Sequence, residues 1–242
     1  MNLKLYEVGG KIRDEILGLS SKDVDYSVVL PNEKLSLTPF EGFSYMEEEL
    51  KKEGYTIFLS TFPCFTIRAK FPTGYEHEGL VADFVLARKE IGYKEGTREP
   101  IVELGCLYDD LVRRDFTLNT IAKNESGVII DLFNGKEDLN NKILKTPLDP
   151  YRSLNNDPLR ILRGLRFAIT KGFKIYPPVL DAMRCPKIQE KLFNVVSIER
   201  VREELNKMLA FDTLKTLRML EKVNLTEGVF SRDLKLTSTL KQ

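Results

Sequence analysis

The chain contains very little histidine and cysteine, which limits the chemistry it can perform. Its 242 residues include one histidine, His77, and three cysteines, none of which belongs to a CxxC pair. Structural zinc sites need four closely spaced Cys or His ligands, so this composition excludes one. The odd number and wide separation of Cys64, Cys106 and Cys185 predict free thiols in a reducing compartment. Catalysis would therefore have to depend on carboxylates and arginines. His77 is most simply explained as a residue at the tip of a hairpin.

Long apolar segments are also absent from the sequence. No apolar run approaches the roughly 18 residues that a membrane-spanning helix needs, and the mean hydropathy is −0.24. The first residues lack the basic start and the long apolar stretch of a secretory signal. We therefore expect a cytoplasmic protein that has no membrane segment.

Charge is balanced overall but unevenly distributed along the chain. The 37 Lys and Arg residues nearly balance the 36 Asp and Glu residues, yet residues 1–150 carry a net charge of −7 and residues 151–242 a net charge of +8. This asymmetry is typical of a metal-binding region followed by a region that binds a polyanion. Chance and solvated helix faces are the simpler alternative, and charge alone does not decide between the two.

Hydrophobic periodicity predicts two domains. Strand-like and helical segments are mixed up to about residue 135, and only helices are predicted after it. The expected strands cover 3–8, 24–30, 55–59, 65–70, 80–86 and 127–132, and the expected helices cover 11–17, 46–53, 107–113, 158–169, 179–183, 197–209 and 213–223. We therefore predict an α+β domain over residues 1–143 and an all-helical domain over residues 144–242, with the segment 144–155 as their junction.

The first candidate site combines a double glycine with an Asp-x-Asp pair. Gly9 and Gly10 separate a predicted strand from a predicted helix, where backbone N–H groups can approach a phosphate closely, and Arg13 lies one turn into that helix. Asp23 and Asp25 are two apart at the start of a strand, so both carboxylates point to the same side. Like charges this close require a cation between them, and Mg²⁺ prefers carboxylate and phosphate oxygens. Each motif alone is typical of a turn or a solvated strand edge, but together they indicate a nucleotide and metal site.

This segment resembles the first signature of the class II tRNA nucleotidyltransferases, the family of CCA-adding enzymes and bacterial poly(A) polymerases within the polymerase-β superfamily. Four later segments resemble the other signatures of the family, in the family's order. They are 113–119 (RRDFTLN), 131–139 (DLFNGKEDL), 156–168 (NDPLRILRGLRFA) and 196–205 (VSIERVREEL). The resemblance implies a polymerase-β-like nucleotidyltransferase head, with a mixed sheet and helices, followed by an all-α neck and body domain.

The resemblance also implies the metal ligands. Asp83 resembles the carboxylate that the family places on a strand ahead of an arginine, here Arg88. Asp23, Asp25 and Asp83 would then hold two Mg²⁺ ions, one activating an RNA 3′-hydroxyl and the other stabilising the leaving pyrophosphate. Without the resemblance, Asp83 is equally compatible with capping the end of a strand.

Further residues are implied to bind the sugar and the phosphates of the nucleotide. Arg114 would reach phosphate, while Asp115 and Asn119, which are four apart, would bond ribose hydroxyls from one helical face. The structural alternative for Asp115 is a cap at a helix end.

The segment that begins at Asp157 predicts how a base is selected. Asp157, Arg160, Arg163 and Arg166 follow one another at a step of three, so we expect them to share one helix face. An acceptor from Asp157 beside a donor from Arg160 matches the amine and the ring nitrogen of cytosine and adenine, whereas uracil and guanine present the reverse polarity. The later arginines would face the triphosphate. The alternative is an ordinary amphipathic helix, and both interpretations can hold together.

Together, these expectations predict one reaction, to which there are alternatives. The chain would be an enzyme that transfers CMP and AMP from CTP and ATP to the tRNA 3′ end without a template, and we predict no protein partner. A CC-adding, A-adding or poly(A)-forming enzyme shares the same motifs, and a catalytically idle nucleotide- or RNA-binding relative is the alternative from another class. Asn156 stands where the family usually has glutamate.

Overall fold

The computed structural model describes residues 2–19, 24–75, 77–94 and 100–230. Its contacts divide the chain into two compact units. Among the described residues, those up to Tyr93 and Pro100–Lys136 form the head unit, and those from Glu137 onward form the helical unit together with Lys94. The boundary between the units follows Lys136, whereas the sequence predicts that the second domain starts at residue 144. The domain limits therefore stay a prediction.

A seven-stranded mixed sheet forms the centre of the head unit, with the strand order β3-β4-β5-β2-β1-β8-β9. Neighbouring strands are antiparallel except for β2 and β5, which run parallel. The strands are β1 (Lys4–Val8), β2 (Asp25–Val29), β3 (Thr56–Thr61), β4 (Thr66–Lys70), β5 (Val81–Leu86), β8 (Ile121–Asn124) and β9 (Ile129–Asp131). This mixed sheet confirms the predicted α+β class of the head.

Three strands of the head unit were not expected from the sequence. β8 is short, and β6 (Arg88–Tyr93) pairs with β7 (Pro100–Leu104) in a separate two-stranded sheet. The strand β6 begins with three charged residues, so it lacks the alternation of apolar and polar residues that indicates a strand. Strands whose apolar alternation is short or interrupted were therefore not predicted, and β8 is one of them although it lies inside the main sheet between β1 and β9.

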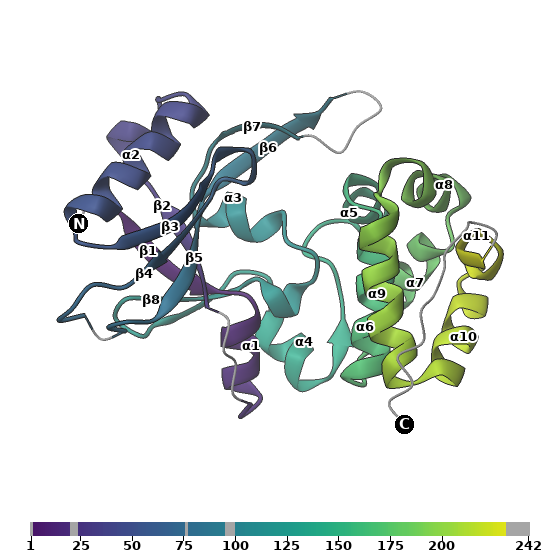
Figure 1. Cartoon of the computed structure of the whole chain (residues 1–242). Helices are drawn as coiled ribbons and strands as arrows, with labels where there is room; N and C mark the ends of the chain where they lie inside the picture. The colour runs from purple at the N-terminus through teal and green to yellow at the C-terminus, as the bar shows by residue number, and fades with distance from the viewer. Residues whose placement is uncertain (1, 20–23, 76, 95–99, 231–242) are drawn as a thin grey trace. The chain divides into compact units, whose positions relative to one another are not determined.

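Helices cover both faces of the main sheet (Figure 1). They are α1 (Gly10–Ile16), α2 (Pro39–Lys52) and α3 (Leu107–Val112), with 3₁₀ turns η1 (Asn32–Lys34), η2 (Phe62–Cys64) and η3 (Thr117–Asn119). On one face, Met46 and Leu50 of α2 are fully buried against the sheet. On the other, Leu111 of α3 packs with Val8 and Ala122. The α2 helix starts earlier than predicted, because Thr38 and Glu41 form a capping box ahead of its apolar residues.

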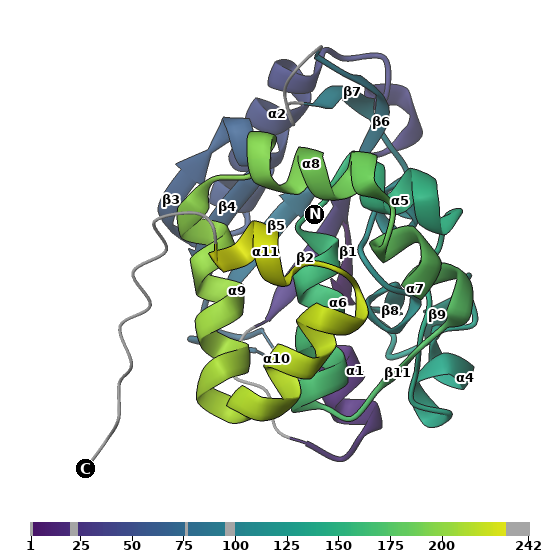
Figure 2. The same ribbon diagram turned by 90° about the vertical axis from the view of Figure 1, so that its right-hand side faces the viewer.

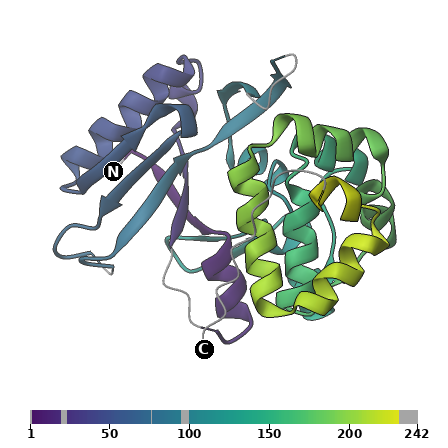
Figure 3. The same cartoon turned by 45° about the vertical axis from the view of Figure 1, so that its right-hand side comes forward.

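The helical unit contains a succession of short helices around one apolar cluster. They are α5 (Pro150–Asn156), α6 (Arg160–Thr170), α7 (Pro177–Met183), α8 (Pro186–Val195), α9 (Ile198–Phe211), α10 (Thr213–Lys222) and α11 (Thr226–Phe230), and α4 (Gly135–Asn140) contains the division between the units. Figures 2 and 3 show α6 beside α9, whose side chains Leu165 and Leu205 are both fully buried in the cluster. This arrangement confirms a helical second part.

Two details of the second part correct the sequence analysis. The segment expected to be a junction contains the helix α5, which Asp149 caps and Pro150 begins. Strand pairing also continues past residue 135, because β10 (Ile143–Leu144) pairs in parallel with β11 (Lys174–Ile175). Two-residue strands are too short to produce a periodic pattern, so the sequence carried no signal for them. Among the described residues, no helix is long and apolar enough to cross a membrane.

Candidate active site

Two predicted metal ligands stand side by side on the sheet of the head unit. Asp25 of β2 is the register partner of Asp83 of β5 in the parallel pair. Directly paired residues of neighbouring strands point to the same face. That face lies opposite the α2 core, because the next residues along the two strands, Tyr26 and Phe84, are buried in that core with their rings stacked 5.2 Å apart. The structure therefore brings Asp25 and Asp83 together, and Asp23 lies outside the described residues.

Arg68 of β4 lies beside Asp83 on the neighbouring strand, and it was not predicted from the sequence. It is the register partner of Asp83 across β4 and β5, and its Nε and Nη2 donate to Asp83 Oδ1 and Oδ2, each at 2.7 Å. A bidentate guanidinium compensates the charge of the carboxylate while holding it in one orientation. Nothing in the local sequence marks Arg68, because its importance depends on strand register.

The glycine turn lies close to the first of these carboxylates, Asp25. Gly9 has φ +77° and ψ −133°, a conformation that side chains with a Cβ rarely adopt. A Cβ built on Gly9 would lie 3.4 Å from Arg114 Nη1 and 3.5 Å from Asp25 Oδ2. The turn therefore brings the backbone close to Arg114 and Asp25 at once. Gly10 begins α1, and Arg13 of that helix lies near it, since Arg13 Nη2 is 3.5 Å from a Cβ built on Gly10.

A hydrogen-bonded chain joins α1 to the segment expected to read ribose. Arg13 Nη1 donates to Asn119 Oδ1 at 3.0 Å, and Asn119 Nδ2 donates to Asp115 Oδ1 at 2.8 Å. Both Asp115 and Asn119 are buried. The expectation that they share one helical face is wrong, because α3 ends at Val112 and Asn119 belongs to η3. They meet through an irregular turn, which Asp115 stabilises by accepting from the N–H of Phe116.

Asp110 orients the arginine pair beside this turn and was also missed by the sequence analysis. It is completely buried, and Arg113 and Arg114 both form ion pairs with it, that of Arg114 at 2.8 Å. Burial alone would raise the pKa of Asp110, but the two guanidinium groups outweigh it and hold the pKa well below its ordinary value. The carboxylate thus stays charged and fixes Arg114 near Gly9. In the sequence, the signal that could have identified Asp110 is an acidic residue three and four positions before two consecutive arginines.

In the helical unit, Asp157 lies between two helices. It caps the C-terminus of α5 in an extended conformation, and its Oδ1 accepts from the N–H of Leu159 at 3.2 Å. The expectation that Asp157 shares a helix face with the arginines is therefore wrong. The reason is Pro158, which disfavours a helical conformation at the residue before it.

Arg160 begins α6 with its side chain turned inward. It is 9% exposed, its backbone N–H donates to Asp157 O at 3.1 Å, and its Nη1 donates to Ser153 Oγ at 2.7 Å. A buried guanidinium held by a hydroxyl has a defined position from which to donate further hydrogen bonds. Asp157 and Arg160 thus lie at the same α5–α6 turn.

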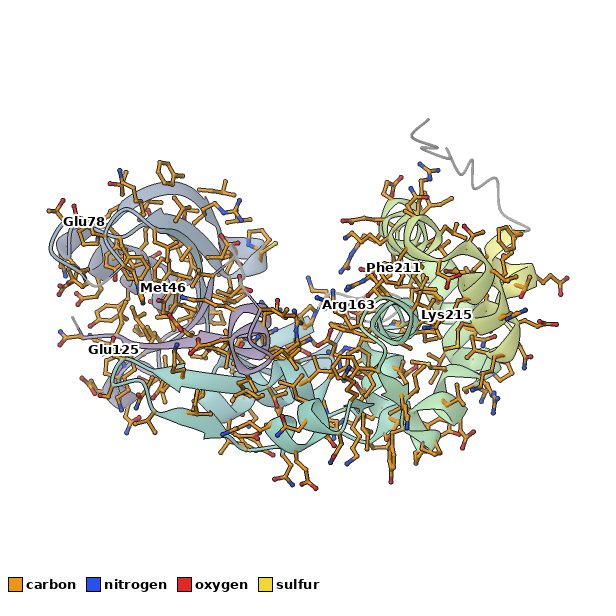
Figure 4. The ribbon with its side chains drawn as sticks, turned by 90° about the horizontal axis from the view of Figure 1, so that it is seen from below. Met46, Glu78, Glu125, Arg163, Phe211 and Lys215 are labelled. Atoms are coloured by element: carbon orange, nitrogen blue, oxygen red, sulfur yellow. The ribbon has the colours of Figure 1, made fainter. Side chains whose placement is uncertain are left out.

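The next two arginines of α6 have different surroundings. Arg166 Nε donates to Glu204 Oε2 of α9 at 2.6 Å, and its guanidinium lies 4.9 Å from the centre of the Phe167 ring. Arg166 therefore holds α6 against α9, and a contact with triphosphate stays a prediction. Arg163, which Figure 4 labels, belongs to the same helix and is partly buried.

Comparison with known proteins identifies the family. The poly A polymerase head domain matches residues 5–145, and a probable RNA- and SrmB-binding region of polymerase A matches residues 172–235. The chain belongs to the tRNA nucleotidyltransferase and poly(A) polymerase family. Its resemblance to the class II signatures is thereby confirmed.

Individual members of the family match over most of this chain. The tRNA nucleotidyltransferase cca2 of Schizosaccharomyces pombe is 35% identical over 239 residues, which are 95% of this chain and 48% of that protein. The Bacillus stearothermophilus CCA-adding enzyme in complex with CTP superposes with a TM-score of 0.72 at 26% identity, over 92% of this chain and 49% of the other.

A second solved structure is a tRNA nucleotidyltransferase complexed with a primer tRNA and an incoming ATP analog. It superposes with a TM-score of 0.69 at 29% identity, over 94% of this chain and 59% of the other. This chain spans about half the length or less of the curated relatives it matches.

Proposed function

We propose that this chain carries the nucleotidyl-transfer site of an enzyme that adds CMP and AMP, from CTP and ATP, to the 3′ end of tRNA. The observation that carries the proposal is the register pairing of Asp83 with Asp25, the residue that lies close to the Gly9 turn, where Arg114 also lies. Family membership supports the reaction class. The solved relatives that hold CTP, or a primer tRNA with an ATP analog, support the substrates.

The carboxylates of the head unit fit a magnesium site. Asp25 and Asp83, with Asp23 from outside the described residues, would hold the two ions, and carboxylate oxygens are the ligands that Mg²⁺ prefers. Asp83 remains a suitable ligand beside Arg68, because an ionised carboxylate has about four acceptor sites on its two oxygens. When bound, magnesium supplies charge stabilisation for phosphoryl transfer.

The remaining head residues would bind and orient the nucleotide. The backbone of Gly9 and Gly10, together with Arg13 and Arg114, would donate to the phosphates. Asp110 holds Arg114 in place before substrate arrives, so little reorganisation is needed when the negative charge of the triphosphate is bound.

Asp115 and Asn119 would bond the ribose hydroxyls. Asn119 already links Arg13 to Asp115, so the phosphate and ribose contacts form one connected network. Occupation of one part of that network would therefore help to orient the other.

Asp157 and Arg160 would read the base in the helical unit. Cytosine and adenine both offer an amine donor beside a ring-nitrogen acceptor, which an aspartate acceptor beside an arginine donor complements. A uracil or guanine would set donor against donor at Arg160 and acceptor against acceptor at Asp157, and each hydrogen bond to a charged group that is lost costs roughly 1.5–3 kcal/mol. Arg163 and Arg166 would add positive charge towards the triphosphate.

The test measures incorporation of labelled nucleotide into tRNA that lacks its CCA end. The double variant Asp23→Ala/Asp25→Ala and the single variant Asp83→Asn should lose incorporation by at least about a hundredfold, because electrostatic stabilisation of the transferring phosphoryl group is lost. Asp181→Asn, an exposed carboxylate on α7, is the matched control and should keep full activity. Undiminished incorporation by the double variant would refute the metal assignment.

Omitting nucleotides separates the possible products. CTP alone, ATP alone and the two together are offered to tRNAs that end before C74, C75 and A76. A CCA-adding enzyme extends each end by only the missing residues. A CC-adding, A-adding or poly(A)-forming enzyme gives a different pattern, and an idle binding protein releases no pyrophosphate.

A further inference from the structure

The proposed reaction does not account for Arg68, the arginine of β4 that contacts Asp83. Its Nε and Nη2 donate to the two carboxylate oxygens of Asp83 at 2.7 Å each, so one guanidinium engages both oxygens of a residue assigned to magnesium. Bidentate pairs of this kind are among the stronger and more directional ion pairs in proteins. Asp83 thus already has a cation from its own chain as a partner.

Four charged side chains share this face of strands β2, β4 and β5. Asp25, Asp83 and Arg68 are register partners across the three strands. Lys70 lies two residues from Arg68, and alternate residues of a strand point to the same face. Ala69, between them, is buried in the core on the opposite face. Two negative and two positive charges cancel, so the described residues of these strands compensate their own carboxylates.

A second guanidinium lies near the other carboxylate of the pair. A Cβ built on Gly9 would lie within 3.5 Å of both Arg114 Nη1 and Asp25 Oδ2. The charge of Arg114 is partly compensated by its ion pair with Asp110 at 2.8 Å. Asp25 and Asp83 therefore each have an arginine in their surroundings. The positive charge that two neighbouring carboxylates require is supplied here by side chains.

The Arg68–Asp83 pair is open to solvent. The side chain of Arg68 is 55% exposed, and that of Asp83 is 25% exposed. Ion pairs at such exposed positions contribute little to stability, so the fold gives little reason for this one. The same exposure lets an ion from solvent approach Asp83 without any opening of the core.

Arg68 would affect such an ion in two opposite ways. An ionised carboxylate has about four acceptor positions, and the two hydrogen bonds from Arg68 leave others for a metal ion while fixing the orientation of Asp83. The guanidinium is also a positive charge next to the place where a divalent cation would bind, and like charges repel. Orientation favours binding of the ion, whereas repulsion lowers its affinity, and variants can separate the two effects.

We propose that Arg68 is a positioning residue of the transfer site that orients Asp83 and, as a cation bound to it, lowers the affinity of the carboxylates for a divalent ion while no nucleotide is bound. The inference rests on the proposed function, because it takes Asp83 as a metal ligand. A triphosphate would bring the negative charge that Arg68 cancels. The site would therefore bind metal together with nucleotide more readily than metal alone.

The test measures binding of Mn²⁺ alone, as the probe for Mg²⁺, to the full chain by electron paramagnetic resonance of the free ion. Arg68→Gln removes the charge but keeps an amide donor, and it should bind Mn²⁺ about fivefold more tightly than wild type. Arg68→Lys keeps the charge but cannot form the bidentate contact, and its affinity should stay within about twofold of wild type. Because Arg68 is exposed, both variants should melt close to the wild-type temperature.

Lys4→Gln is the matched control for loss of a positive charge. Lys4 is an exposed residue of β1, four positions from Val8, the register partner of Asp25. Four residues of a strand span about 13 Å, which is more than the Debye length of about 8 Å at physiological salt. Lys4→Gln should therefore bind Mn²⁺ as wild type does.

The double variant Arg68→Gln/Asp83→Asn shows where the ion binds, since it should lose the gain that Arg68→Gln alone produces. Full incorporation of nucleotide by Asp83→Asn would refute the metal assignment of the proposed function, and the inference with it. Three results would overturn the inference alone while Asp83→Asn is inactive. They are Mn²⁺ binding by Arg68→Gln no tighter than by wild type, equal changes in Arg68→Gln and Arg68→Lys, and a gain that persists in the double variant.

Discussion

At the scale of single residues, Asp110 shows how one buried charge can organise several others. It accepts from Arg113 and Arg114 while being completely buried, and Arg114 in turn lies against the Gly9 turn. Removing one partner from such a group leaves buried charge uncompensated, which costs far more than losing an exposed ion pair. Asp110 therefore affects both stability and the position of a candidate phosphate ligand.

We predict that Asp110→Asn lowers the free energy of unfolding at pH 7 by about 3–5 kcal/mol, as breaking a buried pair does. Because the pKa of Asp110 is lowered in the folded state, its contribution is complete above the unfolded pKa of about 3.9 and is lost as the pH falls further. Urea denaturation at pH 7, 5 and 3 measures this. The difference between wild type and variant should shrink at pH 3. A constant difference, or an equal effect from the exposed Asp181→Asn, would contradict the assignment.

Arg160 is the residue on which base selection depends in this proposal. It is buried, and Ser153 holds its guanidinium. A guanidinium fixed in this way presents a donor in a defined direction, and a base that offers a donor at that point loses a hydrogen bond.

We predict that Arg160→Lys reduces discrimination between CTP and UTP by about tenfold or more, since one hydrogen-bond donor of fixed direction is lost. The measurement is kcat/KM for each nucleotide on tRNA lacking its CCA end. Arg152→Lys, an exposed residue of α5, is the control. Unchanged discrimination with normal folding would show that another residue reads the base.

At the scale of elements, Gly135 at the start of α4 has no room for a side chain. A Cβ on Gly135 would lie 2.2 Å from Thr117 O and 2.9 Å from Ile121 Cγ1, so the backbone of Gly135 packs directly on η3. The N–H of Gly135 also donates to Asp131 Oδ1 at 2.8 Å. This contact supports the turn that carries Asn119.

We predict that Gly135→Ala destabilises the protein by about 1–3 kcal/mol or more through overpacking against backbone. Nucleotide affinity should also fall, because η3 must shift. Gly92→Ala is the control, since its Cβ would meet only Ile101 at 3.8 Å. Equal unfolding curves for the two variants would show that the α4–η3 contact relaxes freely.

Elements with a continuous apolar pattern were predicted well from sequence, and α6 and α9 lie within a few residues of their expected limits. The short helices α1, α3 and α7 were also predicted, but several other helices were not. The helices α5 and α8 fall in segments where no continuous apolar stripe stands out. Their identification depends on packing against other helices, which local sequence does not contain.

At the scale of the whole molecule, the two units have separate apolar cores. Residues of one core lie between Leu3 and Leu104, and those of the other between Leu154 and Val229. A core loses stability locally when one of its side chains is truncated. Damage to one unit should therefore be separable from damage to the other.

We predict that Leu165→Ala destabilises the helical unit by about 2–5 kcal/mol, the usual cost of removing a fully buried leucine. Hydrogen exchange should rise in α6 and α9 while β1, β2 and β5 keep their protection. Leu217→Ala, a partly exposed leucine of α10, is the control. An equal rise in both units would contradict separate cores.

The sequence alone determined which residue types could perform the chemistry and the order in which they occur. The Gly-Gly turn, the Asp-x-Asp pair, the paired arginines and the Asp157–Arg160 segment are local patterns, so they could be found without a structure. Tertiary structure decided which of them meet. The pairing of Asp25 with Asp83, the clamp of Arg68 and the link from Arg13 to Asn119 all join segments far apart in the chain. Strand register and packing set these contacts, and neither is encoded within a single segment.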